Sequence, residues 1–180
     1  MLKCRKALVD KLVKAGMPRF DGYYMMDGKY MFCDGYRVYL LNEDAGYSPA
    51  SLPFDLVGVL RSGHSKEFNA ANKLWEYDPN FKCYEIDMDK LKAFIKDESN
   101  KYRSGTPLPY PITSEGGEPT TMWVNARYLL EGIELIQHNA LKHERVIEVY
   151  NDGNPIHPIY VYSTDGEAAI ILPVRHKKQD

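Results

Sequence analysis

Apolar residues recur at helical spacing in three stretches of the chain. The first lies between Lys3 and Ala15, and Gly16 and Pro18 end it. The apolar stripes are Leu8, Val9, Leu12 and Val13 in the first stretch, Leu91, Phe94 and Ile95 after Asp87, and Leu129, Leu130, Ile133 and Ile136 after Asn125. Asp87 and Asn125 are residue types that cap helices, so we expect three helices that each pack one face on a core.

Short segments rich in aromatic and β-branched residues flank five Asp-Gly pairs, which fall into two clusters. A type I′ turn needs positive φ at both central positions, so Asp-Gly is typical of tight hairpins. The first cluster predicts strands over 23–26, 29–33 and 36–41, and the second predicts strands over 145–150, 157–162 and 167–174. The pattern therefore predicts an antiparallel meander near each end of the chain.

A strand also precedes the second and third helices, over 83–86 and 121–124. Shifting the chain by 38 residues places Asp87 on Asn125, which indicates a weak repeat of a strand-helix unit. Four prolines between residues 106 and 119 favour a loop or linker there.

These elements predict an α+β fold made of repeated strand-helix-three-strand units with antiparallel sheets. We expect a single domain over 1–180 with an insertion, whose units span approximately 1–47, 81–105 and 120–180. Residues 48–80 stay unassigned, although 54–60 and 66–75 show hints of helix. The alternative is two trimmed domains, 1–80 and 81–180.

Composition is that of an ordinary globular protein, with 44% hydrophobic and 27% charged residues. No window approaches the roughly 20 apolar residues of a membrane span, so we expect a cytoplasmic protein with no membrane partner. Cys4, Cys33 and Cys83 form no CxxC pair, which favours reduced, buried thiols over a disulfide or zinc site. The formal net charge of −2 means that any contact with DNA needs a segregated basic face.

Two stretches of sequence resemble a known family. Residues 122–175 contain WVNARYLLEGIEL and NPIHPIYVYSTDGEAAIILPVR, and 32–38 read FCDGYRV. Together they resemble the bacterial DNA sliding clamp, the beta subunit of DNA polymerase III, which ends in a Met-Pro-Met-Arg-like sequence and carries a Thr-Asp-Gly-His-Arg-Leu loop. The resemblance covers about 60 residues at the C-terminus and, more loosely, about 40 at the N-terminus. It implies a DNA-clamp-like fold and a non-catalytic function.

In that family the two stretches line a hydrophobic pocket for short clamp-binding peptides of polymerases and repair proteins. Carried over by position, the peptide-binding residues are Gly35, Tyr36, Arg37 and Val38 on one wall, and Ile170, Leu172, Pro173, Val174 and Arg175 on the other. We expect an apolar slot for one or two anchor side chains, with Arg or backbone groups at its rim. Leu172 and Val174 stand where the family commonly has Met, so we expect fewer partners.

The resemblance also implies inner helices that present basic residues to the backbone of duplex DNA. The candidates are Lys3, Lys6, Lys14, Lys92, Lys96, Lys101 and Arg103. Such residues neutralise phosphates without reading the base sequence. A closed ring would require a homo-oligomer of more subunits than the usual dimer, since the bacterial clamp carries three domains in each chain. The reduced length is consistent with an origin in a phage or mobile element.

Each of these signals has a simpler explanation. The loop around Gly35 is also typical of a plain hairpin, and the lysine-bearing helix faces are also typical of solvated surface. His138 and His143 lack a nearby third ligand, and no phosphate-binding loop occurs, so we expect no metal and no cofactor. Two hypotheses therefore compete with the scaffold that binds peptides and tracks DNA: a free peptide-binding adaptor or decoy that does not encircle DNA, and an enzyme with its site in the middle region.

Overall fold

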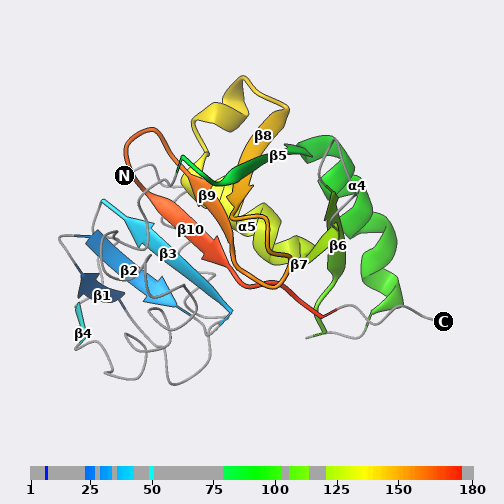
Figure 1. Ribbon diagram of the computed structural model, residues 1–180, viewed down its shortest axis with the longest axis horizontal. Helices are drawn as coiled ribbons and strands as arrows, with labels where there is room; N and C mark the ends of the chain where they lie inside the picture. The colour runs from blue at the N-terminus through cyan, green and yellow to red at the C-terminus, as the bar shows by residue number, and fades with distance from the viewer. Residues whose placement is uncertain are drawn as a thin grey trace.

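The computed structural model describes residues 7, 23–26, 29–33, 36–42, 49–50, 79–102, 106–113 and 121–175 (Figure 1). For residues 23–26, 29, 32–33 and 49–50, only the backbone is considered. The predicted helices over 3–15, 54–60 and 66–75 lie outside this part of the chain, apart from Ala7. Of the predicted site residues, the same is true of Gly35, Lys3, Lys6, Lys14 and Arg103.

Eight strands form one sheet, in the order β4-β1-β2-β3-β10-β9-β8-β5. Their bounds are β1 Tyr23–Met26, β2 Lys29–Cys33, β3 Arg37–Leu41, β4 Pro49–Ala50, β5 Lys82–Asp87, β8 Val146–Asn151, β9 Ile159–Tyr162 and β10 Ala168–Ile171. Neighbouring strands run antiparallel, except that β1 and β4 pair in parallel over two residues. The α+β class with antiparallel sheets is therefore confirmed, and both predicted meanders are present.

A second sheet pairs β6 (Pro109–Thr113) with β7 (Thr121–Asn125). The prediction that 106–119 is only a loop was therefore wrong for 109–113. Pro109 and Pro111 occupy alternate positions of β6. An edge strand can tolerate proline at positions where the backbone N–H would point to solvent and not to the partner strand. A run of prolines does not exclude a strand when the missing N–H groups all face away from the partner.

Two described helices follow two of the strands. α4 (Met88–Glu98) begins at Asp87, whose side chain accepts hydrogen bonds from the backbone of Asp89 and Lys90, both at 3.0 Å. These bonds, led by that from Lys90, hold the pKa of Asp87 below its usual value. α5 (Ala126–Ile136) begins in the same way at Asn125. Both helices have 11 residues and their bounds differ by 38 positions, as the sequence repeat predicted.

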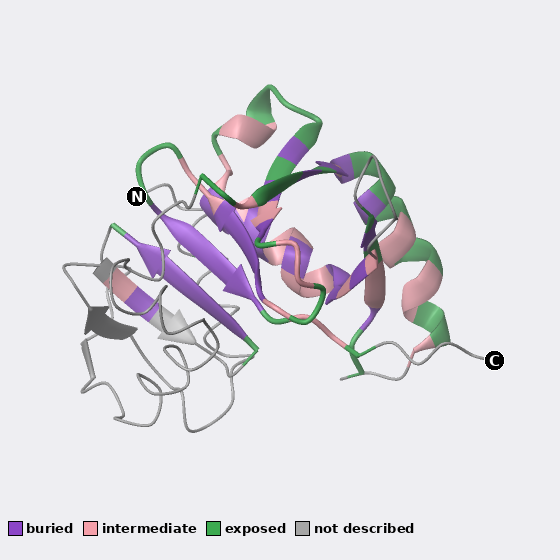
Figure 2. Ribbon diagram, viewed as in Figure 1, coloured by how far each residue is buried: buried purple, intermediate pink, exposed green. Residues whose placement is uncertain are grey.

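The main core lies between α5 and the sheet. Gly132 faces β10 so closely that an added Cβ would lie 3.0 Å from Ile171 Cδ1 and 3.4 Å from the Ala169 Cβ. β3 and β10 are buried along their whole length, in purple in Figure 2. Burial also raises the pKa of Tyr160, so this phenol stays protonated and acts as a packing group.

The pairing of β3 with β10 joins the N-terminal meander to the C-terminal one in a single sheet.

Cys83 is exposed on β5, so the prediction of buried thiols was wrong at this position. Its neighbours Tyr84 and Ile86 are buried, and alternation along the strand therefore turns Cys83 outward. Short 3-10 helices follow α4 and α5, over Ser99–Lys101 and Ala140–Lys142. None of the helices that the structure describes is long and apolar enough to cross a membrane.

Candidate functional site

The two stretches predicted to line a pocket meet at the junction of β3 and β10. The strand register places Val38 opposite Ile170. Two residues beyond this pair, the N–H of Leu172 donates a 2.9 Å hydrogen bond to the carbonyl of Tyr36, which extends the pairing beyond both strands. Val38 and Ile170 stand opposite each other and so project to the same side of the sheet. The backbone bond brings Leu172 beside Tyr36, which lies at a bend outside β3.

Burial divides the four side chains into a buried pair and an exposed pair, and we call the exposed pair the rim. Val38 and Ile170 are each 5% exposed, whereas Tyr36 is 47% and Leu172 40% exposed. Among the residues whose side chains the structure describes, only four large apolar side chains are exposed: Tyr36, Leu172, Val146 and Ile156. We call Tyr36, Val38, Ile170 and Leu172 the apolar patch. Its two exposed members present apolar surface, which favours the docking of an apolar side chain.

Arg37 does not lie at the rim, in contrast to the expectation from sequence. It stands opposite Ile171, and its side chain turns toward α5, where it is 4% exposed and pairs with the carboxylate of Glu131. Its guanidinium also lies 4.1 Å from the centroid of the Tyr128 ring. Alternation along β3 explains the difference, because Arg37 must face the side of the sheet opposite to that of its neighbour Val38.

The segment after β10 closes one end of the apolar patch and then changes sheets. Pro173 forms an isolated bridge with Val124 of β7, and the N–H of Val174 donates to the carbonyl of Trp123 at 2.8 Å. Pro173 and Val174 are partly buried by this pairing, while Arg175 is exposed. Of the predicted cationic groups, Arg175 is thus the one available to a ligand near this end.

Sequence reasoning did not find Tyr128 and Glu131 as part of this region. They lie three residues apart on α5, a spacing that puts them on one helix face. That spacing shows that they are neighbours of each other, but only the register between β3 and β10 brings Arg37 and Tyr36 to them. The Tyr36 and Tyr128 ring centroids lie 6.2 Å apart.

The predicted DNA-contacting lysines of α4 and of the 3-10 helix after it are partly neutralised. Lys92 lies 3.7 Å from Glu134 on α5, and Lys101 lies 2.7 Å from Glu98. Lys96 makes no ion pair with a residue of the described segments and is exposed. The α4 and α5 layer holds three Lys against three acidic residues in α4, and one Arg against two Glu in α5, for a formal charge of −1. This layer is therefore not a basic face.

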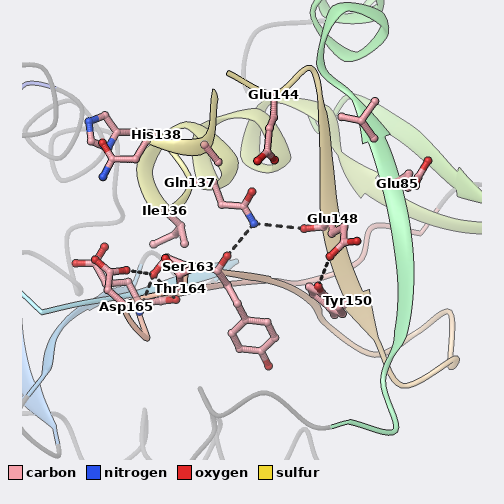
Figure 3. Close-up of a pocket in the computed structure, with 15 residues that line it drawn as sticks. Glu85, Ile136, Gln137, His138, Glu144, Glu148, Tyr150, Ser163, Thr164 and Asp165 are labelled. Atoms are coloured by element: carbon pink, nitrogen blue, oxygen red, sulfur yellow. Dashed lines mark hydrogen bonds between the residues drawn. The ribbon is translucent and has the colours of Figure 1, made fainter. Parts of the chain in front are cut away.

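A hollow of about 670 Å³ lies elsewhere, between β8, the end of α5 and the turn before β10 (Figure 3). Gln137 spans it by donating from Nε2 to the carbonyls of Tyr162 at 2.7 Å and Glu148 at 3.5 Å. The acidic residues that line it are Glu85, Glu144, Glu148, Asp165 and Glu167. No Lys or Arg is among its lining residues, so this hollow repels a phosphate backbone. Within the described segments, no group of three His, Cys, Asp or Glu side chains could hold a metal ion.

The chain matches no protein-family model, and no curated protein matches its sequence. Among solved structures, DNA polymerase sliding clamps are similar to it. The clamp of Caulobacter crescentus is 15% identical, with a TM-score of 0.41, over 82% of this chain and 41% of the clamp. A clamp of Pseudomonas aeruginosa is 10% identical, with a TM-score of 0.49, over 96% of this chain and 64% of the clamp.

The beta clamp of Helicobacter pylori, solved bound to a DNA ligase peptide, is 12% identical with a TM-score of 0.41. It is matched over 82% of this chain and 41% of the clamp. The chain thus spans between 41% and 64% of the length of these three structures. At this distance the likeness concerns the fold alone, and function has to be argued from the residues of this chain.

Proposed function

We propose that the chain is a non-catalytic, clamp-like scaffold that binds short peptides of replication or repair proteins at the apolar patch. The observation that carries this proposal is the hydrogen bond between Leu172 and Tyr36, which joins the two predicted walls and leaves both side chains at the rim. The resemblance of both stretches to the sliding-clamp sequence supports the same conclusion.

The chemistry of the patch limits what can bind there. Its four side chains offer no charge, so the ligand must bring one or two apolar anchors that displace water from Tyr36 and Leu172. Arg175, which is exposed three residues beyond Leu172, favours a ligand that also carries an acidic group or a terminal carboxylate. With Leu172 in place of a flexible Met, the patch has less freedom to adapt, which supports a narrow range of partners.

A direct test titrates a fluorescent clamp-binding peptide from the same cell with the protein and follows its anisotropy. Leu172→Asp places a carboxylate in the patch and should weaken binding about tenfold or more, the usual effect of losing one well-placed apolar anchor. The matched control is Ile156→Asp, because Ile156 is also an exposed apolar residue, at 75%, but lies in the loop before β9. Equal Kd values for the two variants, or no binding by the wild type at high micromolar concentration, would refute the proposal.

A second function, that of a peptide-binding adaptor that does not encircle DNA, is favoured by the charge of the helical layer. The pairing of Lys92 with Glu134 occupies a cation that a DNA-tracking clamp would present to phosphates. The adaptor should remain monomeric in light scattering and bind duplex DNA weakly even at low salt. A tracking clamp should instead form a ring-sized oligomer whose DNA affinity falls steeply with salt.

The enzyme hypothesis places its site in 48–80, almost wholly outside the described residues.

A further inference from the structure

The ring of the rim residue Tyr36 lies next to a stack of three side chains, Tyr128, Arg37 and Glu131. Its ring lies 6.2 Å from the Tyr128 ring, with the two planes tilted by 35°. The Tyr128 ring in turn lies over the Arg37 guanidinium, at 4.1 Å from the centroid to Cζ. The guanidinium is held by the Glu131 carboxylate on the same helix.

Burial prevents Arg37 from contacting a ligand itself. Its side chain is 3% exposed and that of Glu131 is 17% exposed. A buried guanidinium loses its hydration and needs a compensating anion, which Glu131 supplies, and an aromatic face, which Tyr128 supplies. The Tyr39 ring also lies near the guanidinium, at 5.8 Å. The cation is therefore fixed on several sides within the core.

The position of Tyr36 brings its ring against this stack. Tyr36 lies at a bend just before β3, outside the regular ladder, and is 47% exposed. Its backbone carbonyl is fixed by Leu172, but that bond does not set the orientation of the ring. Contact with Tyr128 does restrict the ring, and the Arg37 and Glu131 pair restricts Tyr128.

We propose that Arg37, Tyr128 and Glu131 form a positioning stack that holds the Tyr36 ring ready at the rim of the apolar patch. This inference rests on the proposed function and adds that peptide affinity is tuned from the helix side of the sheet, through an arginine that is too buried to touch the peptide. A ring that is already ordered loses less side-chain entropy when the peptide binds, so breaking the stack weakens binding without removing a contact.

The first experiment observes the ring without any peptide. The protein is labelled with 3-fluorotyrosine, and the resonance of Tyr36, one of 14 tyrosines, is assigned with Tyr36→Phe. In Glu131→Gln, which removes the charge but keeps the shape, the ¹⁹F signal of Tyr36 should shift and broaden. The matched control is Glu134→Gln on the same helix, which removes the partner of Lys92 instead and should leave this signal unchanged. An unchanged Tyr36 signal in Glu131→Gln overturns the inference.

The second experiment measures peptide affinity in a double-mutant cycle. Glu131→Gln should weaken binding about fivefold, an effect of the size expected from loss of pre-organisation. In a Tyr36→Ala background the same change should have less than about a twofold effect, because the ring through which it acts is gone. In a Leu172→Ala background the fivefold effect should persist. An equal effect in all three backgrounds shows that Glu131 does not act through Tyr36 and contradicts the proposal.

A further variant covers the case in which removing the buried charge partner unfolds the protein. Tyr128→Leu keeps an apolar side chain and leaves the ion pair intact, yet removes the ring between Arg37 and Tyr36. It should reproduce the ¹⁹F shift and the loss of affinity while unfolding in urea remains cooperative. If the ¹⁹F results hold but the wild type binds no peptide, the proposed function fails and the positioning stack stands. If peptide binding holds but the Tyr36 signal does not respond to either variant, the stack alone fails.

Discussion

The thiol of Cys83 lies on the exposed side of β5, near two carboxylates. Partial burial, followed by the charge of Glu148 and then that of Glu85, raises the pKa of this thiol. Because only the thiolate reacts with alkylating reagents, Cys83 should react more slowly at pH 7.5 than its exposure suggests. Glu148→Gln should lower the pKa and speed the reaction, as measured by the rate of iodoacetamide labelling at this residue. The experiment uses a background in which Cys4 and Cys33 are replaced by Ser, and an unchanged rate would contradict the electrostatic explanation.

Gly132 offers a second prediction at the scale of one residue. Replacing glycine by alanine inside a helix normally stabilises it by about 1 kcal/mol. Here the new methyl would meet the buried Ile171 at 3.0 Å, so we expect Gly132→Ala to lower the free energy of unfolding by about 1 kcal/mol through overpacking. In an Ile171→Val background, which removes the crowded methyl group, the same substitution should be neutral or stabilising. Urea denaturation of the four proteins measures this coupling, and strict additivity would refute the packing argument.

Single residues also show the limit of what sequence alone revealed. The positions of Tyr36 and Leu172 in one patch followed from a family resemblance, yet the burial of Arg37 did not. The role of Arg37 depends on which side of β3 it faces and on Glu131 of α5, which is 94 residues away in sequence. No local pattern encodes that contact, because it arises only when β3 pairs with β10.

At the scale of elements, the sequence was informative wherever the signal was local. Helix starts at Asp87 and Asn125 were predicted correctly, because a capping side chain acts on backbone groups two or three residues away. Strands β1 and β2 were also located to the residue, because Asp-Gly turns border them. β6 was missed because its prolines resemble a linker, and what makes it a strand is its partner β7.

Asn125 is the cap with the larger expected effect. It is 4% exposed, and its Oδ1 accepts a hydrogen bond from the N–H of Arg127 at 3.2 Å and another from that of Leu108 at 3.4 Å. Asn125→Ala leaves buried donors unpaired and should lower the free energy of unfolding by about 2 kcal/mol. Asn125→Ser keeps a capping side chain of shorter reach, so its free energy of unfolding should lie between those of the wild type and of Asn125→Ala. Far-ultraviolet circular dichroism in urea measures these differences, and an alanine variant as stable as the wild type would contradict the role of the cap.

At the scale of the whole molecule, the sheet does not divide where the sequence suggested a second domain could begin. β10 pairs with β9 on one side and with β3 on the other, so strands from both ends of the chain share one ladder. We therefore expect a fragment of residues 79–180 to lose cooperative unfolding and to aggregate, because β10 becomes an uncovered edge. Adding a separate fragment of residues 1–78 should restore the transition seen in urea. A fragment 79–180 that unfolds at the same midpoint as the full chain would contradict this.

The crossing of the chain from one sheet to the other has a mechanical consequence. Residues 172–174 are bonded to Tyr36 at one end and to Trp123 at the other, so they link the eight-stranded sheet to the two-stranded one. Any sliding of one sheet against the other must stretch this link and displace Leu172. A movement that separates the two sheets would therefore reach the apolar patch through Leu172, which belongs to both the patch and the link.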